Sequence, residues 1–443
     1  MDWGKGLIKI NLKRLRRAVC VTACLTATQA AALTNYGCQG LESSEVLPSV
    51  EGTGGNFYRI SPDLMMFNWL ADESLAHLSD LSEALQSMGT QLIYVPVPTK
   101  ALAMPQQLPL EASYFGYRPD LAASVYEESL VQLKAAGVVA VDANQALRQQ
   151  AFTGQMPFYG TDYRMTSAGG RALAKAVANA LNEFPVYQTL PKSVFTTAEA
   201  GTTELQSAMR HKLQEHCDSE LPSIVAGLPV TQRAVVPGQP GQSNIFATTQ
   251  QTGRIAVIGT ELSEEPTTNF TGYLSEFSGL DVVKYTVTGG NTFDAISSYL
   301  TSSAFIQNRP AFLVWENPIW NGLGNYGDQP MRELIAAARG ACGISIPTIP
   351  TAKGKLRADL STLDLNQQHT LMIDTGAPSQ YARFNFGSRD GMVRTRSVYR
   401  NPEQELTGRF FMPLSGLLDR GTVSVDVEIE GNFGNAPRLM LCL

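Results

Sequence analysis

Helical and strand patterns alternate in the first half of this 443-residue chain, and this order restricts the fold more than any other feature. Residues 72–88 place leucines at helical spacing, Gly89 ends the pattern, and the apolar stretch QLIYVPVP follows. Residues 120–136 repeat the helical pattern, and GVVAVDA follows it. A helix, a glycine and an apolar strand, repeated along a chain, predict an α/β domain whose parallel sheet is flanked by helices.

Later segments extend this sheet. Short apolar runs predict further strands at 254–258, 281–287 and 311–316. A helix is expected over 330–341 and closes the domain. We therefore place the α/β domain at 33–345.

Two regions depart from the α/β pattern. Residues 190–252 are polar and rich in Thr, Gln, Gly and Pro, which predicts an irregular insertion with little sheet. From residue 350 onward, short segments of alternating hydrophobicity are separated by turns. This second pattern predicts a small antiparallel β-sandwich over 350–443.

The first 32 residues have the pattern of a signal peptide: six basic residues, a short apolar core and a small-residue cleavage site. A retained anchor and a lipoprotein signal that uses Cys24 are the alternatives. We expect export to the periplasm. Loss of the six basic residues and Asp2 changes the formal net charge from −6 to −11. This balance excludes a general affinity for nucleic acid or anionic lipid.

Four cysteines remain after removal of the signal peptide, namely Cys38, Cys217, Cys342 and Cys442. An even count in an exported chain indicates two disulfides, and four cysteines allow three connectivities. The domain organisation favours Cys38–Cys217 in the first domain and Cys342–Cys442 across the second. The Cys and His spacings are too wide for a metal site, and we expect no metal and no cofactor.

The chemistry-bearing motifs lie where predicted strands end. The strand at 255–258 runs into Gly259-Thr260, a junction that often presents a nucleophile, yet the next residue is Glu261. Asn269-Phe270-x-Gly272 follows that junction, and Gly289-Gly290 lies further along. Upstream lie the stretches PVPTK, at 96–100, and FYGTDYRMT, at 158–166.

Together these ordered motifs resemble the AlgX/AlgJ family of alginate O-acetylation proteins, and AlgX is the nearer match. The resemblance implies an exported SGNH-hydrolase-like acetyltransferase fold with a circularly permuted motif order. In that family an Asp-x-His motif supplies the acid and the base, and a Gly-Thr-Ser motif supplies the nucleophile. The equivalent positions here hold Asp162, Arg164 and Glu261. The catalytic motifs are therefore degenerate.

Three interpretations of this departure compete. In the first, the true nucleophile is Ser263, although none of the four histidines (His77, His211, His216 and His369) lies in an Asp-x-His context. In the second, Asp162 and Glu261 form a carboxylate pair with altered acid–base chemistry. In the third, which we favour, the chain is a pseudoenzyme, because arginine stays protonated and cannot act as a general base. We expect Glu261 to form an ion pair with Arg164, and Asp162 to be a second partner of its guanidinium.

Two groups of residues are candidates for binding a polysaccharide. Thr99 and Lys100 match the substrate-side motif of the family, and Lys100 is expected to meet a uronate carboxylate. The second group combines arginines, whose forks suit carboxylates, with an aromatic ring that stacks on sugars. Its members are Arg383, Arg394, Arg396, Arg400 and Tyr399. For both groups the alternative is an ordinary solvated surface. In the related proteins this module resembles a carbohydrate-binding module.

These observations lead to one functional hypothesis. We expect a monomeric periplasmic protein of alginate-type exopolysaccharide production that binds an anionic polysaccharide and lacks acetyl-transfer activity. The alternatives are an active polysaccharide O-acetyltransferase and a structural partner of other proteins in a polymer export complex.

Overall fold

The computed structural model describes residues 35–66, 69–234, 254–340, 342–363, 369–415 and 421–442. The predicted signal peptide at 1–32, with Cys24, lies outside the described residues. No helix in the described part of the chain is long and apolar enough to cross a membrane.

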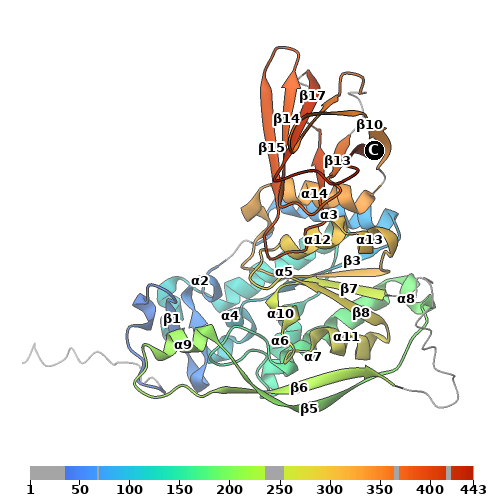
Figure 1. Cartoon of the computed structure of the whole chain (residues 1–443). Coiled ribbons are helices and arrows are strands. Elements are labelled where there is room, and N and C mark those ends of the chain that lie inside the picture. Colours follow the sequence, from blue (N-terminus) through green and yellow to red (C-terminus); the bar gives the residue numbers. More distant parts are fainter. Residues whose placement is uncertain are drawn as a thin grey trace, which may run out of the picture.

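A five-stranded parallel sheet forms the centre of the first part of the chain, as predicted (Figure 1). The strand order is β4-β3-β9-β7-β8. Neighbouring strands pair in parallel throughout. The bounds are β3 Gln91–Val97, β4 Val139–Ala140, β7 Arg254–Gly259, β8 Asp281–Thr286 and β9 Phe312–Pro318. The central strands are apolar on both sides because both faces of the sheet are covered.

Helices cover the two faces and bury a separate core on each. The side chain of Tyr94 packs into one core, whereas those of Ile93 and Val95 pack into the other, as the two-residue strand period requires. The first face carries α3 (Asp72–Ser87), α5 (Pro119–Ala135), α12 (Asp294–Thr301) and α14 (Gln329–Arg339). The opposite face carries α6 (Ala143–Phe152), α7 (Ser167–Ala180) and α11 (Phe270–Ser278).

The expectation of an irregular insertion with little sheet was wrong for the described residues. β5 (Phe195–Leu205) and β6 (Ile224–Arg233) form a long antiparallel ribbon, with α9 (Ala208–Gln214) between them. The ribbon is polar because most of its residues are at least partly exposed. Its composition therefore resembles that of a loop, although threonine and valine favour extended backbone. Residues 235–253 of the predicted insertion lie outside the described residues.

The C-terminal part consists of two antiparallel sheets that enclose one apolar core, which confirms the predicted fold class. The five-stranded sheet has the order β11-β12-β17-β14-β15, and the four-stranded sheet has the order β10-β18-β13-β16. The bounds are β10 Cys342–Ile346, β11 Thr348–Ala352, β12 Lys355–Asp359, β13 Thr370–Asp374, β14 Tyr381–Ser388, β15 Val393–Tyr399, β16 Arg409–Pro413, β17 Thr422–Ile429 and β18 Arg438–Cys442. We call this part the β-module.

Shorter elements complete the fold. The strands β1 (Ser49–Glu51) and β2 (Phe57–Arg59) pair with each other. The short α-helices are α2 (Ile60–Asp63), α4 (Lys100–Ala103), α8 (Pro185–Thr189), α10 (Glu261–Glu264) and α13 (Ser303–Gln307). Short 3₁₀ helices span Leu41–Ser43, Thr53–Gly55, Pro105–Gln107, Leu110–Phe115, Leu181–Glu183 and Leu323–Tyr326.

Both predicted disulfides are present. Cys38–Cys217 ties the N-terminal segment to the chain just after α9, and Cys342–Cys442 joins β10 to β18. Polar contacts also hold the β-module on α12 and α14. One of them is a buried ion pair in which Arg400 donates to both carboxylate oxygens of Glu333, at 2.8 and 2.6 Å.

Candidate functional site

The carboxyl edge of the parallel sheet gathers the positions that the resemblance singled out. Thr99 follows β3, and Glu261 follows β7. The loop over 158–166 reaches the same edge, where Thr166 caps α7 by accepting a hydrogen bond from the amide of Gly169 (3.2 Å). Ligand sites of open α/β sheets lie at this edge.

Arg164 is held by three partners at once. Its Nε and Nη2 donate to the two carboxylate oxygens of Asp162, at 3.0 and 2.8 Å. Its Nη1 donates to Glu265 at 2.9 Å, and Nη2 also reaches the carbonyl oxygen of Gln206 at 2.7 Å. The predicted Asp162–Arg164 contact is therefore present. Every guanidinium nitrogen is engaged, which fixes the side chain in place.

Asp162 is almost fully buried, with 1% of its surface exposed. Burial favours the protonated acid, but hydrogen bonds from Arg164 and Ser207 outweigh this effect and hold the pKa of Asp162 below its ordinary value. Ser207 belongs to the insertion, where it caps α9. Gln206 and Ser207 together show that the insertion packs directly against this site.

The expected ion pair between Arg164 and Glu261 is absent among the described residues, so this prediction was wrong. Glu261 instead accepts a hydrogen bond from the hydroxyl of Tyr163 at 3.2 Å, and the guanidinium of Arg59 lies over the Tyr163 ring. The reason is a helical turn. α10 begins at Glu261, and Glu265 follows one helical turn later. The carboxylate of Glu265, and not that of Glu261, therefore forms the ion pair with Arg164. Sequence reasoning missed Glu265, although the spacing of the two glutamates was visible.

Ser263, the alternative nucleophile, is buried and has no imidazole partner among the described residues. Its hydroxyl donates to Glu316 of β9 at 3.1 Å, and the amide of Thr260 donates to the same carboxylate at 2.8 Å. Burial raises the pKa of Glu316 to about 7, although the hydrogen bonds from Thr260 and Ser263 oppose the shift. Sequence reasoning also missed Glu316, whose signal is an acid at the end of an apolar strand.

Lys100 does not face a substrate, so that expectation was wrong, and the solvated alternative was wrong too. Only 1% of Lys100 is exposed, and burial lowers its pKa to about 7. Its ammonium donates to the carbonyl oxygens of Tyr159, Gly160 and Asp162, at 2.6, 2.7 and 3.3 Å. Lys100 therefore ties down the loop that carries Asp162. Thr99 is also buried, and its hydroxyl caps α4 by accepting from the amide of Leu102.

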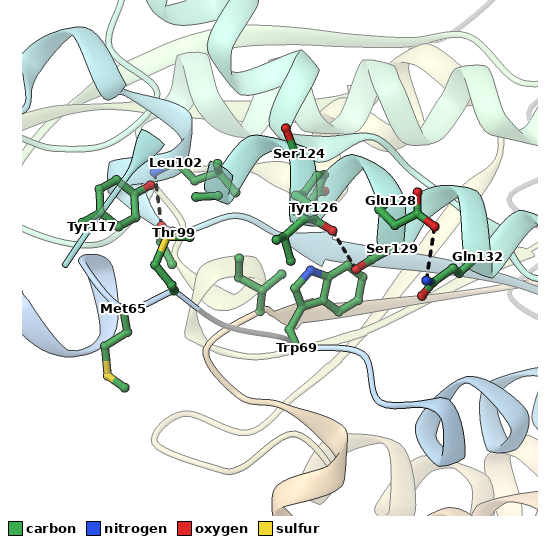
Figure 2. A pocket seen from close by; sticks show the side chains of 14 residues that line it. Met65, Trp69, Thr99, Leu102, Tyr117, Ser124, Tyr126, Glu128, Ser129 and Gln132 are labelled. Atoms are coloured by element: carbon green, nitrogen blue, oxygen red, sulfur yellow. Dashed lines mark hydrogen bonds between the residues drawn. The ribbon is translucent and has the colours of Figure 1, made fainter. Parts of the chain in front are cut away.

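A pocket of about 450 Å³ opens beside Thr99 (Figure 2). Ile319, directly after β9, lines it as well, so the pocket lies at the same edge of the sheet. Figure 2 shows Thr99, Leu102 and Tyr117 toward one end, Glu128 and Gln132 toward the other, and Trp69 between them. The volume lies within the range of small-molecule sites.

The glycan-binding candidates of the β-module lie on different faces of one sheet. Arg394 and Arg396 are paired with the buried Phe386 and Phe384, so they share the inner face, on the edge strand β15. Arg383 and Tyr399 lie on the outer face of the same sheet. Alternation along β15 thus separates residues that are neighbours in the sequence.

Arg400 is not available to a ligand, so that expectation was wrong. Its side chain is 4% exposed and is occupied by Glu333. On the outer face, Tyr399 is 67% exposed and stacks on Tyr381, with 5.7 Å between ring centroids. Arg383 lies 3.9 Å from Glu428 and remains partly exposed. Among the described residues, no group of three or more His, Cys, Asp or Glu side chains is placed to hold a metal ion.

Comparison with known proteins places the chain among alginate biosynthesis proteins. Over 260 residues the chain is 26% identical to the alginate biosynthesis protein AlgX of Pseudomonas aeruginosa, a match that covers 58% of this chain and 53% of AlgX. It is 30% identical over 277 residues to the probable alginate O-acetylase AlgJ of Pseudomonas putida, covering 60% of this chain and 68% of AlgJ. The chain thus spans about half the length of the AlgX sequence that it matches.

The solved structure of Pseudomonas aeruginosa AlgX superposes with a TM-score of 0.73 at 20% identity. The superposition covers 89% of this chain and 94% of that structure, so the two folds agree across the α/β part and the β-module. The family described as "SGNH hydrolase-like domain, acetyltransferase AlgX" matches residues 68–319, more than half of the chain. The chain belongs to this family.

Proposed function

We propose that this protein is a polysaccharide-binding or scaffolding member of the AlgX family that acts in alginate-type exopolysaccharide biosynthesis and has lost acetyl-transfer chemistry. The observation that carries the proposal is the set of contacts that the Arg164 side chain makes. At the position of the family's base, its guanidinium is bound by Asp162, Glu265 and the carbonyl oxygen of Gln206.

The chemistry of the site supports this proposal. Acetyl transfer through a serine needs an imidazole to accept the hydroxyl proton. The hydrogen bonds from Arg164 keep Asp162 ionised, and their mutual contacts raise the pKa of Arg164 further. Neither group then exchanges a proton near neutral pH. Glu261 is a carboxylate bonded to Tyr163, not a hydroxyl beside a base.

The β-module supports the binding half of the proposal. Over 351–443 it carries a formal charge of +1, whereas the remainder of the chain after residue 32 carries −12. The stacked pair of Tyr381 and Tyr399 offers an exposed ring for a sugar face, and Arg383 lies beside Tyr381 on the same face. Arg394 and Arg396 add positive charge on the other face of β15. We propose the periplasm as its location, since two disulfides are typical of an oxidising compartment and the first 32 residues read as a signal peptide.

Ester cleavage tests the loss of catalysis. The unmodified protein is expected to hydrolyse a small activated acetyl ester no faster than the uncatalysed reaction, and Ser263→Ala is expected to leave that rate unchanged. Joint replacement Arg164→His and Glu261→Ser restores the residue types of the base and the nucleophile. Some ester cleavage is then expected only from the double variant, because members of such a unit act together. Turnover by the unmodified protein that Ser263→Ala abolishes would contradict the proposal.

Polymer binding tests the other half. Affinity electrophoresis in gels that contain a polyuronate should show retardation that weakens with salt, because exposed charges are screened over about 8–10 Å at physiological ionic strength. The joint replacement Arg383→Gln and Tyr399→Ala should reduce the retardation, and so should Arg394→Gln with Arg396→Gln. Arg438→Gln is the control, because it removes an exposed arginine from the opposite sheet. Equal retardation of all variants would remove the β-module from the binding site.

A further inference from the structure

A second, polar cleft of about 310 Å³ lies where α3 and α14 meet the four-stranded sheet of the β-module (Figure 1). α14 packs against both α3 and β16. Thr370, Pro413 and Cys442 are neighbours in the register at one end of that sheet, and all three line the cleft. In the described part of the chain, this α3–α14 cleft shares no lining residue with the pocket beside Thr99.

Two arginines of α14 line the α3–α14 cleft. Arg332 and Arg339 are seven residues apart, almost two helical turns, so they lie on one side of the helix about 10 Å apart along its axis. Ile335 and Ala336 line the cleft between them. Arg332 donates through Nη1 to the hydroxyl of Ser415 at 3.1 Å, and neither arginine forms an ion pair with a carboxylate among the described residues. Both guanidinium groups therefore keep N–H donors for a ligand.

The other polar side chains of the cleft add donors and little negative charge. His77 of α3 and His369, directly before β13, line the cleft, and Thr370 adds a hydroxyl. Asp80 is the one carboxylate among the described lining residues. The cleft thus has more cationic than anionic groups, although the whole chain has a formal net charge of −6. A concave surface with such an excess attracts anions.

We propose that the α3–α14 cleft binds a phosphate group, as inorganic phosphate or as a small phosphate monoester. A phosphate group carries about −1.5 to −2 charges at pH 7 and three strong acceptor oxygens, whereas a carboxylate carries one charge on two oxygens. Donors from α3, α14 and the end of the sheet suit the ligand with more acceptors. A bound phosphate would join the α/β part to the β-module, because its donors come from both parts. The site is independent of the proposed function, since it contains neither Arg164 nor the exposed tyrosines.

Isothermal titration with inorganic phosphate tests the site, at pH 7 and with the ionic strength held constant by chloride. One phosphate should bind per chain. Arg339→Gln should weaken binding by about tenfold, the loss expected for one charge-assisted hydrogen bond. The double replacement Arg332→Gln and Arg339→Gln should abolish it. Arg339 is exposed, so its single variant should fold even if the double variant does not.

Two further variants separate a binding site from a general effect of charge. Arg438→Gln removes an arginine of the same four-stranded sheet that does not line the cleft, and it should leave the affinity unchanged. Asp80→Asn removes the lining carboxylate and should tighten binding about twofold, because an exposed charge contributes little. A merely structural role of these residues predicts no such gain.

Parallel titrations with glycerol phosphate and glucuronate establish the chemistry of the ligand. Both phosphates should bind, and the tighter one identifies whether the free ion or a monoester is preferred. Glucuronate should bind about tenfold more weakly, because it offers fewer charges and acceptor oxygens. Equal or tighter binding of glucuronate would overturn the phosphate assignment.

Thermal unfolding gives a second readout. Bound phosphate should raise the thermal midpoint in a saturable way, because it binds the folded state. Phosphate is also excluded from protein surfaces and stabilises every variant alike, so the comparison between variants is decisive. The increase should be smaller for Arg339→Gln than for Arg438→Gln. Equal increases in both, no saturable binding to the unmodified protein, or weaker binding to Asp80→Asn would overturn the inference. None of these outcomes alters the retardation of the protein by a polyuronate.

Discussion

Removal of the Arg164 cation should destabilise the protein strongly, because Arg164 is the main partner of the buried carboxylate of Asp162. In Arg164→Gln, Asp162 stays 98–99% enclosed but loses two charge-assisted hydrogen bonds. Breaking a buried ion pair by removing one partner costs about 3–5 kcal/mol. The Arg164 side chain is 17% exposed, so we expect the lower end, about 3 kcal/mol.

The two glutamates provide matched comparisons for this variant. Glu265→Gln removes one charged contact of Arg164 and should cost about 1–2 kcal/mol. Glu261→Gln alters a single hydrogen bond from Tyr163 and should cost less than about 1 kcal/mol. Each change replaces one carboxylate by an isosteric amide within the same five residues. The contrast therefore isolates which glutamate holds Arg164.

Urea unfolding followed by far-ultraviolet circular dichroism measures these differences as shifts of the midpoint at constant slope. Acid adds a second readout. The pKa of Asp162 is below its ordinary 3.8, so the stability that it contributes is present above pH 3.8 and is lost as the pH falls through the lowered pKa. Arg164→Gln should remove this acid-sensitive contribution. A cost for Glu261→Gln equal to that for Glu265→Gln, or a cost below about 1 kcal/mol for Arg164→Gln, would refute this account.

Three further buried charges give separate predictions. The pKa of Glu316 is raised from 4.5 to about 7, so its contribution to stability is complete below pH 4.5 and is lost, by about 3 kcal/mol, as the pH rises through 7. In Glu316→Gln, the free energy of unfolding from urea titrations should vary less with pH over that window. A pH dependence equal to that of the unmodified protein would contradict this prediction. Glu333→Gln should lower the free energy of unfolding by about 3–5 kcal/mol, because it leaves Arg400 buried without its carboxylate. Replacing both residues by Met should lower it far less. Equal decreases of the thermal midpoint in the two variants would exclude this reasoning. Lys100→Met should lower the free energy of unfolding by about 2–4 kcal/mol, since three carbonyl oxygens lose their donor. It should also make the 159–162 loop sensitive to protease. A loop that stays uncut would count against Lys100 as the residue that holds it.

Local patterns were sufficient for the parallel sheet. The strands at 91–97 and 312–318 are apolar without interruption because both faces of the sheet are covered, and that signal is visible in the sequence. The ribbon over 195–233 was missed for the opposite reason. Its strands lie at the surface, so no apolar alternation marks them, and their polar composition is that of a loop.

The pairing of charges followed from tertiary structure. The motif order placed Arg164 and Glu261 at one site, but the start of α10 directs Glu265 to the guanidinium and leaves Glu261 to Tyr163. Likewise, alternation along β15 sends Arg400 inward to Glu333, a residue 67 positions away. Spacing along the chain gives the face of a helix or strand, whereas the partner across that face depends on packing.

The sequence by itself determined the α/β and β-sandwich classes, because helical and strand periodicities are local in the chain. The cysteine pairs followed from the cysteine count together with the domain organisation. Only the tertiary structure decided which of the candidate site residues are buried, which carboxylate neutralises Arg164, and that Lys100 serves the loop and not a ligand. Burial and ion pairing depend on distances between segments far apart in sequence. Those distances are set when the helices, strands and loops of the chain pack together.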